Sequence, residues 1–320
     1  MGAERRVDMD KAKELLKRYV NSRMSEPGCY ETCLGGVRTY RRDEVTRPET
    51  CFYRPMIVKM VQGYKRALMG TEEYRYGVDE VLVTGVDMPA ASMICEASPK
   101  APSTSIAIDL DKNLIAQLAL EIPHKSLDTG AVMKGVHVQA LDADLLDAFL
   151  RLAELFETPE KLAVIGPMIV REIHYLLLVG PDGHRLRSFY TLGSQGNQVA
   201  QAITWLKQNI ATAVQIEELA EKVNMAPSTF HRHFKEVTTL SPLQFQKRLR
   251  LHEAQRLMLM HGMDAGSAGM SVGYESLSQF NREYKRLFGE PPRKDVKRLR
   301  EEPPYTRPAM VERLVEMHGF

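Results

Sequence analysis

The chain has 320 residues, of which 44% are hydrophobic and 26% charged, a balance that excludes an intrinsically disordered chain. This length predicts about two packed domains. No uninterrupted apolar stretch of about 18 residues occurs, which argues against secretion and membrane insertion and for a cytoplasmic protein. The net charge is +2, but residues 201–300 hold 16 Lys and Arg against 10 Asp and Glu, an excess that favours a polyanionic partner, although a solvated basic face would show it equally.

The first hundred residues change from a helical to an extended pattern. Residues 9–24 place Leu15, Leu16 and Tyr19 on one side at helical spacing, which predicts an amphipathic opening helix. From residue 30 to residue 108, glycine and proline interrupt short runs such as MIVKMVQG and EVLVTGVDM. This punctuation predicts an all-β barrel or sandwich.

All cysteines lie in this first third, and we interpret them as reduced thiols. They are Cys29, Cys33, Cys51 and Cys95. Cys29 and Cys33 share a face in either a helix or a strand, so their spacing permits joint metal binding, oxidation or reaction with an electrophile. The alternative is two unreactive thiols. Residues 1–123 contain no histidine, so we expect no metal site built on imidazole ligands in the β region.

Polar and aromatic side chains within the β region are candidates for orienting a small ligand in an apolar pocket. They are Tyr64, Lys65, Tyr74, Tyr76 and Asp87.

Helical spacing returns after the β region. The predicted elements are a helix capped by Asp109 or Asp111 and ended by Pro123, a strand near residues 135–140, and helices over 142–156 and 165–179. The last helix is apolar almost all round, so we expect the β domain, a second copy of the chain, or both, to cover it. The Gly-, Ser- and Gln-rich residues 192–198 predict a domain boundary.

After residue 198 the pattern predicts a helix-turn-helix. A helix over residues 216–223 is followed by the turn NMAPS and by a second helix that begins with Ser228 as its cap and buries Phe230 and Phe234. This arrangement typically places the second helix in the major groove of DNA. Its outer face predicts DNA contacts from Ser228, His231, Arg232 and Lys235, with Arg232 suited to guanine and Lys235 to phosphate.

The same pattern occurs a second time. A long helix over residues 243–259 carries a basic flank of Lys247, Arg248, Arg250 and Arg256. A short segment, the turn VGYES and a helix over 276–288 follow. The polar face of this second recognition helix consists of Ser278, Gln279, Asn281, Arg282 and Lys285.

These motifs resemble those of the AraC/XylS family of bacterial regulators over about residues 198–299. IEELAEKVNMAPSTFHRHFKEVTTLSPLQFQKRLRL is similar to the first half of the family's DNA-binding domain, and VGYESLSQFNREYKRLFGEPP to its signature over the second half. The resemblance implies base-reading positions at Ser228, His231, Arg232, Ser278, Gln279 and Arg282. Ala268-Gly269 stands where the family has an apolar Ile-Ala pair, and because glycine costs about 0.5–1 kcal/mol relative to alanine inside a helix, we expect the second unit to be looser.

Residues 34–122 also resemble the N-terminal domain of one branch of the family, through YRPMIVKMVQGYKRALMG, EYRYGVDEVLVTGVDMPA and EASPKAPSTSIAIDLD, with weaker similarity to about residue 195. This implies a cupin-like domain that senses a small molecule and helps the protein to dimerise. We therefore predict an α+β protein of two domains: a cupin-like β-barrel with flanking helices over residues 1–195, an all-α double helix-turn-helix over 196–300, and a tail over 301–320.

The predicted function is that of a sequence-specific regulator of transcription, and not of an enzyme. Its predicted partners are double-stranded DNA and an unknown small-molecule effector, without cofactor, metal or membrane, while a homodimer and contact with RNA polymerase are hypotheses. The alternative is a barrel enzyme, or a thiol-based sensor of electrophiles or redox state, coupled to the DNA module. It ranks second because no nucleophile stands beside a recognisable base.

Overall fold

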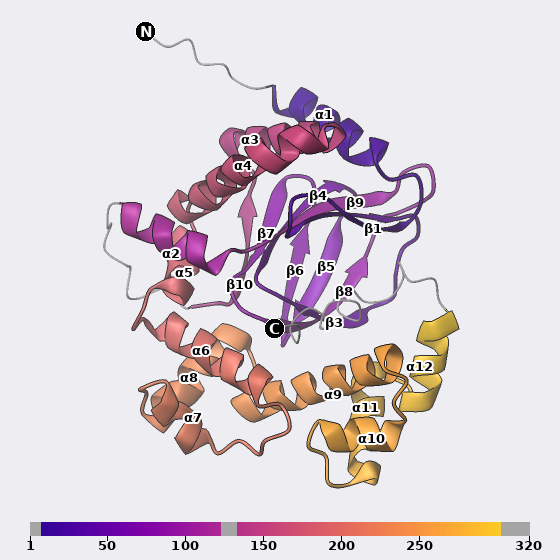
Figure 1. The fold of residues 1–320 in the computed structure, drawn as a ribbon, viewed down its shortest axis with the longest axis vertical. Helices are drawn as coiled ribbons and strands as arrows, with labels where there is room; N and C mark the ends of the chain where they lie inside the picture. Colours follow the sequence, from indigo (N-terminus) through magenta and orange to yellow (C-terminus); the bar gives the residue numbers. More distant parts are fainter. Residues whose placement is uncertain (1–7, 123–132, 302–320) are drawn as a thin grey trace.

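The computed structural model describes residues 8–122 and 133–301, and it confirms an α+β protein with strands in its first half and helices alone in its second (Figure 1). The strands are β1 (Gly28–Glu31), β2 (Val37–Arg42), β3 (Glu49–Tyr53), β4 (Met56–Gln62), β5 (Lys65–Met69), β6 (Glu72–Tyr76), β7 (Glu80–Thr84), β8 (Met88–Ile94), β9 (Ser103–Asp109) and β10 (Val136–Ala140). The helices of the N-terminal domain are α1 (Met9–Ser22), α2 (Lys112–Glu121), α3 (Ala143–Glu154), α4 (Pro159–Val179) and α5 (Gly183–Tyr190). The C-terminal helices are α6 (Gln195–Gln208), α7 (Ile216–Lys222), α8 (Pro227–Thr238), α9 (Pro242–Met260), α10 (Ala265–Ser271), α11 (Leu277–Phe288) and α12 (Pro292–Glu301).

The strands form two antiparallel sheets. One has six strands in the order β1-β2-β9-β4-β7-β10, and the other has four in the order β3-β8-β5-β6. In the larger sheet, β9 pairs with β2 through Thr39 and Ile106 and with β4 through Ile57 and Ile108. Because side chains alternate along a strand, each sheet presents one face to the other sheet and one face outward.

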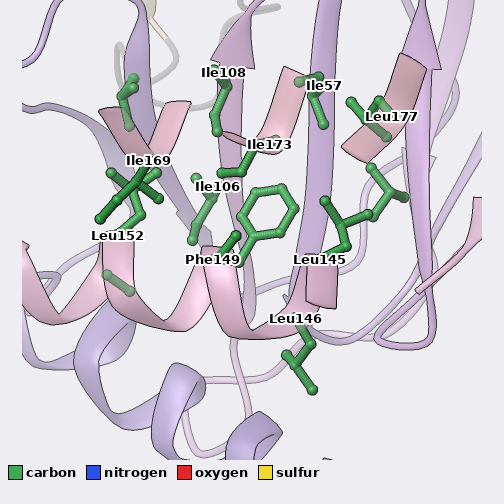
Figure 2. Packing of buried hydrophobic residues seen from close by; sticks show 14 of the residues in the cluster. Ile57, Ile106, Ile108, Leu145, Leu146, Phe149, Leu152, Ile169, Ile173 and Leu177 are labelled. Atoms are coloured by element: carbon green, nitrogen blue, oxygen red, sulfur yellow. The ribbon is translucent and has the colours of Figure 1, made fainter. Parts of the chain in front are cut away.

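Helices α1, α3 and α4 cover the outer face of the six-stranded sheet and form the main core of the N-terminal domain. Figure 2 shows Ile57, Ile106 and Ile108 from the sheet facing Phe149 of α3 and Ile173 of α4, and all five side chains are buried. Helix α3 begins where the side chain of Asp142 accepts a hydrogen bond from the Leu145 amide, as an acidic N-cap does. Asp111 caps α2 in the same way.

Helix α4 is longer than the predicted helix over residues 165–179. It begins at Pro159 and continues through Pro167. Its length and composition alone would suffice to cross a membrane, but one face, including Leu162, Ile169 and Leu177, is buried in the core of the N-terminal domain. The opposite face remains exposed. Its large apolar side chains are Val164, Ile165, Met168, Tyr175 and Val179.

The segment between the domains is shorter than the predicted boundary over residues 192–198. The Ser194 hydroxyl accepts a hydrogen bond from the Asn197 amide and so caps α6, which already starts at Gln195. The predicted tail falls almost wholly on residues 302–320, which lie outside the described residues.

The C-terminal domain packs against the four-stranded sheet, and the two domains share one buried cluster (Figure 1). The Phe52 ring on β3 lies 5.7 Å from the Phe245 ring on α9. The Gly135 amide donates to the Val237 carbonyl at 3.0 Å, and the Thr50 hydroxyl to the Leu287 carbonyl at 3.4 Å. These contacts involve the end of α8, the first turn of α9 and the end of α11, so the N-terminal domain contacts both halves of the helical domain.

Candidate nucleic-acid interface and effector cavity

Helix α8 has the composition of a recognition helix, with an apolar inner face and a polar outer face. Phe230 and Phe234 are fully buried, with ring centroids 5.5 Å apart. The helix starts at Pro227, after Ala226, so the predicted cap at Ser228 is wrong: proline at the first position already fits an unpaired helix start. Ser228 therefore lies in the first turn of the helix, and its hydroxyl does not cap the helix. The side chains predicted to contact DNA are all exposed: Ser228, His231, Arg232 and Lys235.

Arg232 is held by its neighbours on the outer face of α8. Its guanidinium lies 3.4 Å from the Glu236 carboxylate and 3.2 Å from Nε2 of His233, whose Nδ1 lies 2.9 Å from Glu236. His233 is buried, and the pattern reading did not identify it. These contacts orient the Arg232 side chain while leaving it accessible, because 62% of that side chain is exposed.

Helix α11 repeats this arrangement in the second unit. Ser276 caps the helix by accepting from the Gln279 amide at 3.3 Å, and Phe280 and Tyr284 are fully buried. Among the predicted DNA-contacting residues, Ser278, Arg282 and Lys285 are exposed, whereas Gln279 and Asn281 are half-buried. The Gln279 amide group donates to the Glu283 carboxylate at 3.3 Å, so this side chain already has a partner.

Gly269 in α10 allows close packing in the second unit. Its backbone lies against the Phe280 ring, and a β-carbon there would come within 3.0 Å of that ring. The glycine that departs from the family pattern therefore accommodates an aromatic side chain of α11, which offsets part of the missing apolar volume.

Long helix α9 joins the two units, and its predicted basic flank serves mainly to hold them together. The Arg250 guanidinium donates to the carbonyls of Ile210 and Thr212 before α7 and of Gly273 before α11. Arg256 is buried and paired with Glu253. At these two positions of the basic flank, the donors therefore bind backbone carbonyls and a carboxylate within the protein.

A buried carboxylate on α11 adds a second link that the sequence pattern did not reveal. Glu283 accepts from the Tyr274 hydroxyl at 2.9 Å and pairs with Lys247 of α9 at 3.1 Å. These hydrogen bonds lower the pKa of Glu283 against the opposing effect of burial. The sequence does contain a signal for this link: Glu283 is an acidic residue on the side of the helix that also carries the apolar Phe280 and Tyr284.

A partly open cavity of about 120 Å³ lies between the two sheets of the N-terminal domain. The residues that line it are Tyr40, Arg42, Thr46, Glu49, Cys51, Phe52, Tyr53, Met56, Val58, Lys65, Ser92, Met93, Ile94, Ser105 and Ala107. Burial lowers the pKa of Lys65 to about 8, with the positive charge of Arg42 adding to the effect, and burial raises the pKa of the Cys51 thiol to about 11. The cavity therefore contains one half-buried ammonium group.

Of the predicted effector contacts, Lys65 alone lines this cavity. The Tyr76 hydroxyl lies behind the wall, 3.0 Å from that of Tyr53, and the Tyr74 hydroxyl donates to Glu72 at 2.7 Å. Asp87 lines a second cavity at the junction of the domains, where it pairs with Lys207 of α6 at 2.7 Å. Tyr64 is not among the described residues that line either cavity. These five side chains do not meet in one site, because their positions depend on which strands pair in the sheets. Residue spacing along the sequence does not reveal that pairing.

The two cysteines proposed as redox candidates have different surroundings. Cys29 lies in β1, where its thiol contacts the Tyr40 hydroxyl, and Cys33 is exposed beyond the strand end, with its sulfur 3.5 Å from the Pro159 carbonyl. Both are free thiols. Within residues 8–122 and 133–301, no three His, Cys, Asp or Glu side chains gather as a metal site would require.

Comparison with known proteins finds relatives of both domains. Residues 34–185 match the family model of the AraC-type transcriptional regulator N-terminus, and residues 219–298 match that of a helix-turn-helix domain. The HTH-type transcriptional activator RhaS of Pectobacterium carotovorum subsp. carotovorum is 26% identical over 144 residues, which are 44% of this chain and 50% of that protein. RhaS of Escherichia fergusonii is 32% identical over 91 residues, which are 28% and 33%. The chain thus spans between a third and half of the length of these curated relatives.

A solved structure shows a similar fold over both domains. It is that of unsaturated fatty acid-bound wild-type ToxT from Vibrio cholerae strain SCE256, with a TM-score of 0.55 and 11% identity over 81% of this chain and 94% of that one. The two family models together account for the strand-rich domain and for the double helix-turn-helix, in the order that the motifs predicted. The chain therefore belongs to the AraC family of transcriptional regulators.

Proposed function

We propose that this chain is a sequence-specific DNA-binding regulator of transcription that acts in the cytoplasm and responds to a small molecule bound in its N-terminal domain. The observation that carries the proposal is the pair of helices α8 and α11, each with buried aromatic residues on one face and exposed Arg and Lys on the other. Phosphate contacts from the basic domain supply affinity, and the two recognition helices supply sequence choice.

The test of DNA recognition uses the two arginines on the outer faces. Fragments selected from genomic DNA by the purified chain define an operator, and Arg232→Ala and Arg282→Ala should each weaken binding to it by about 1–3 kcal/mol, because each removes a donor pair suited to guanine. Arg18→Ala on α1, at the opposite end of the molecule from the C-terminal domain (Figure 1), is the matched control. Unchanged operator affinity in both recognition-helix variants would refute the assignment.

The effector part of the proposal rests on the cavity between the sheets. The strand β3 lies between this cavity and the DNA-binding domain: Cys51, Phe52 and Tyr53 line the cavity, and Phe52 also packs on Phe245. That a protein of similar fold holds an unsaturated fatty acid supports ligand binding by this architecture. A ligand changes DNA binding only if it binds the two domain arrangements with different affinities.

We further propose that the protein is a homodimer and that the exposed face of α4 forms the interface. Val164 and Met168 are each 67% exposed on neighbouring turns of one helix, and a second copy of α4 is a partner of matching apolar character. Contact with RNA polymerase stays a prediction. The alternative of a barrel enzyme or thiol sensor gains no support from the described surroundings of Cys29 and Cys33.

A further inference from the structure

The cavity between the sheets carries an unbalanced positive charge. Among the described residues that line it, Arg42 and Lys65 are cationic and Glu49 alone is anionic. A desolvated charge without a counter-charge is costly, so a cavity with this composition stabilises an anion that enters it.

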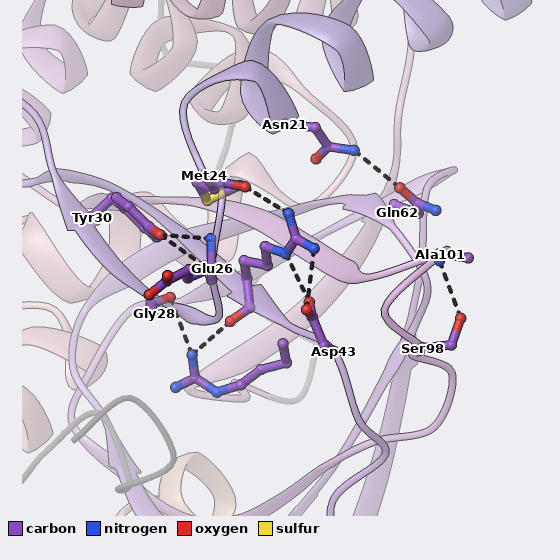
Figure 3. Close-up of polar contacts among 11 residues, drawn as sticks. Asn21, Met24, Glu26, Gly28, Tyr30, Asp43, Gln62, Ser98 and Ala101 are labelled. Atoms are coloured by element: carbon purple, nitrogen blue, oxygen red, sulfur yellow. Dashed lines mark hydrogen bonds and ion pairs between the residues drawn. The ribbon is translucent and has the colours of Figure 1, made fainter. Parts of the chain in front are cut away.

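The two cations differ in what they already bind. The Arg42 guanidinium donates to the carbonyl oxygens of Gly28 at 3.1 Å and Arg41 at 2.9 Å; Figure 3 shows the Gly28 end of this contact. The Lys65 ammonium has no hydrogen-bonded or ion-paired partner within the part of the chain that the structure describes, although the charges of Arg42 and Glu49 act on it. Lys65 is therefore the group with donors to offer.

The rest of the lining and the volume limit the body of the ligand. The apolar and aromatic members of the wall include Tyr53, Met56, Val58, Ile94 and Ala107. A cavity of roughly 150 Å³ lined by apolar side chains holds one benzene molecule. At about 120 Å³, this cavity accommodates a body of similar or smaller size, and a long alkyl chain would extend beyond it.

We propose that this cavity binds a compact organic anion, with one carboxylate-sized head at the Lys65 ammonium and an apolar body no larger than about a benzene ring. This inference rests on the proposed sensing function and deepens it by giving the ligand class. The anion supplies the missing counter-charge at Lys65, and the apolar body replaces poorly hydrogen-bonded water along Met56, Val58 and Ile94.

The experiment is isothermal titration calorimetry on the full chain at pH 7 with hexanoate, benzoate, hexanamide and dodecanoate. We expect hexanoate or benzoate to bind at least tenfold more tightly than hexanamide, which has the same body without the charge, and dodecanoate to bind more weakly than hexanoate. Equal affinities for hexanoate and hexanamide would overturn the charge assignment, and tighter binding of dodecanoate would overturn the size limit.

Three variants identify the anchoring group. Lys65→Met should abolish the preference for hexanoate over hexanamide, Lys65→Arg should keep it, and Lys100→Met, at an exposed lysine of the same domain, should leave it unchanged. The preference is the ratio of the affinities for hexanoate and hexanamide, so a general loss of binding does not imitate its loss. Retained binding of hexanamide shows that the cavity of the Lys65→Met variant is folded. A preference that survives Lys65→Met refutes the site. Operator binding by the same preparation separates the two proposals: acids that fail to bind a chain that still binds DNA contradict this inference alone, whereas loss of DNA binding contradicts the proposed function alone.

Discussion

Gly70 lies at the turn between β5 and β6, where the N-terminal domain meets the end of α8. Its φ is +64°, a value that favours glycine, and a β-carbon there would overlap the side chain of Thr239. The Thr239 hydroxyl donates to the Met69 carbonyl at 3.3 Å, so the two turns are in direct contact. A glycine is required here both by the backbone and by the neighbouring domain.

Gly70→Ala should therefore destabilise the docked arrangement more than the backbone conformation alone requires. Gly193→Ala is the matched control, since Gly193 has a similar φ of +77° but no atom within 4 Å of a β-carbon. We expect the control to lose about 1 kcal/mol of unfolding free energy, the approximate cost of placing alanine in the left-handed region, and Gly70→Ala to lose more. Chemical denaturation measures both variants. Equal losses of unfolding free energy in the two variants would show that the Thr239 side chain moves aside without destabilising the protein.

His252 of α9 occupies the other side of the same junction. Its ring lies 5.1 Å from the Phe52 ring and 5.2 Å from the Phe288 ring, and its Nε2 has no hydrogen-bond partner among the residues described. Burial, with a smaller effect of the Arg248 charge, lowers the pKa of His252 to about 3. The histidine is therefore neutral in the docked state at ordinary pH.

Acidification should weaken the fold through His252. Because the pKa is lower in the folded than in the unfolded chain, the unfolded state binds the extra proton between pH 6.5 and about 3, so stability falls as pH drops through that window. At pH 5 the contribution is about 2 kcal/mol. Denaturation at pH 7.5 and pH 5 should show a smaller pH-dependent loss for His252→Leu than for the unmodified chain, and identical losses would exclude this residue as the cause.

At the scale of elements, β3 contacts both the cavity and the DNA-binding domain. Glu49, Cys51, Phe52 and Tyr53 line the cavity, and Thr50 and Phe52 contact α11 and α9. A change in the cavity that displaces this strand is therefore transmitted directly to the helix that joins the two DNA-binding units.

Phe52→Ala should loosen α9 from the sheet. Loss of a buried phenyl ring costs about 3 kcal/mol or more, and here the lost contacts are those with Phe245 and His252. Hydrogen exchange followed by mass spectrometry should show faster exchange in α9 around these residues. Leu68→Ala, at a half-exposed position of the same sheet, should change neither stability nor exchange appreciably. Unaltered exchange in α9 would contradict a role of β3 in docking.

Residue spacing predicted the helices and faces that depend on residues close together in the sequence. It was a weaker guide to features formed by residues that are far apart in the sequence. The buried Phe230 and Phe234 and the exposed Arg232 follow from one helical period, so α8 and its outer face were predictable. The cavity joins Lys65 of β5 to Arg42 of β2, strands in different sheets, and spacing alone could not place them together. The structural use of Arg250 was hidden for the same reason, because its acceptors lie about 23 to 40 residues away.

At the scale of the whole molecule, α4 packs on the side of the larger sheet that faces away from the DNA-binding domain (Figure 1), and its opposite face is exposed. Two copies joined there would keep both helical domains free. We expect the chain to sediment as a dimer of 36.3 kDa subunits, and Met168→Glu to sediment as a monomer, because a buried carboxylate without a partner is costly. Leu192→Glu, at another exposed apolar residue, should remain dimeric. A monomeric unmodified chain at micromolar concentration would contradict the proposal.

The double use of β3 also restricts how such a regulator can change over evolutionary time. A mutation at Cys51 or Tyr53 that admits a new inducer moves the backbone on which Phe52 rests, and so alters the basal output of the target promoter as well. New inducer specificity should therefore arise more readily on the opposite wall, at Val58 or Ala107, where the strands back onto the rigid core of the first domain.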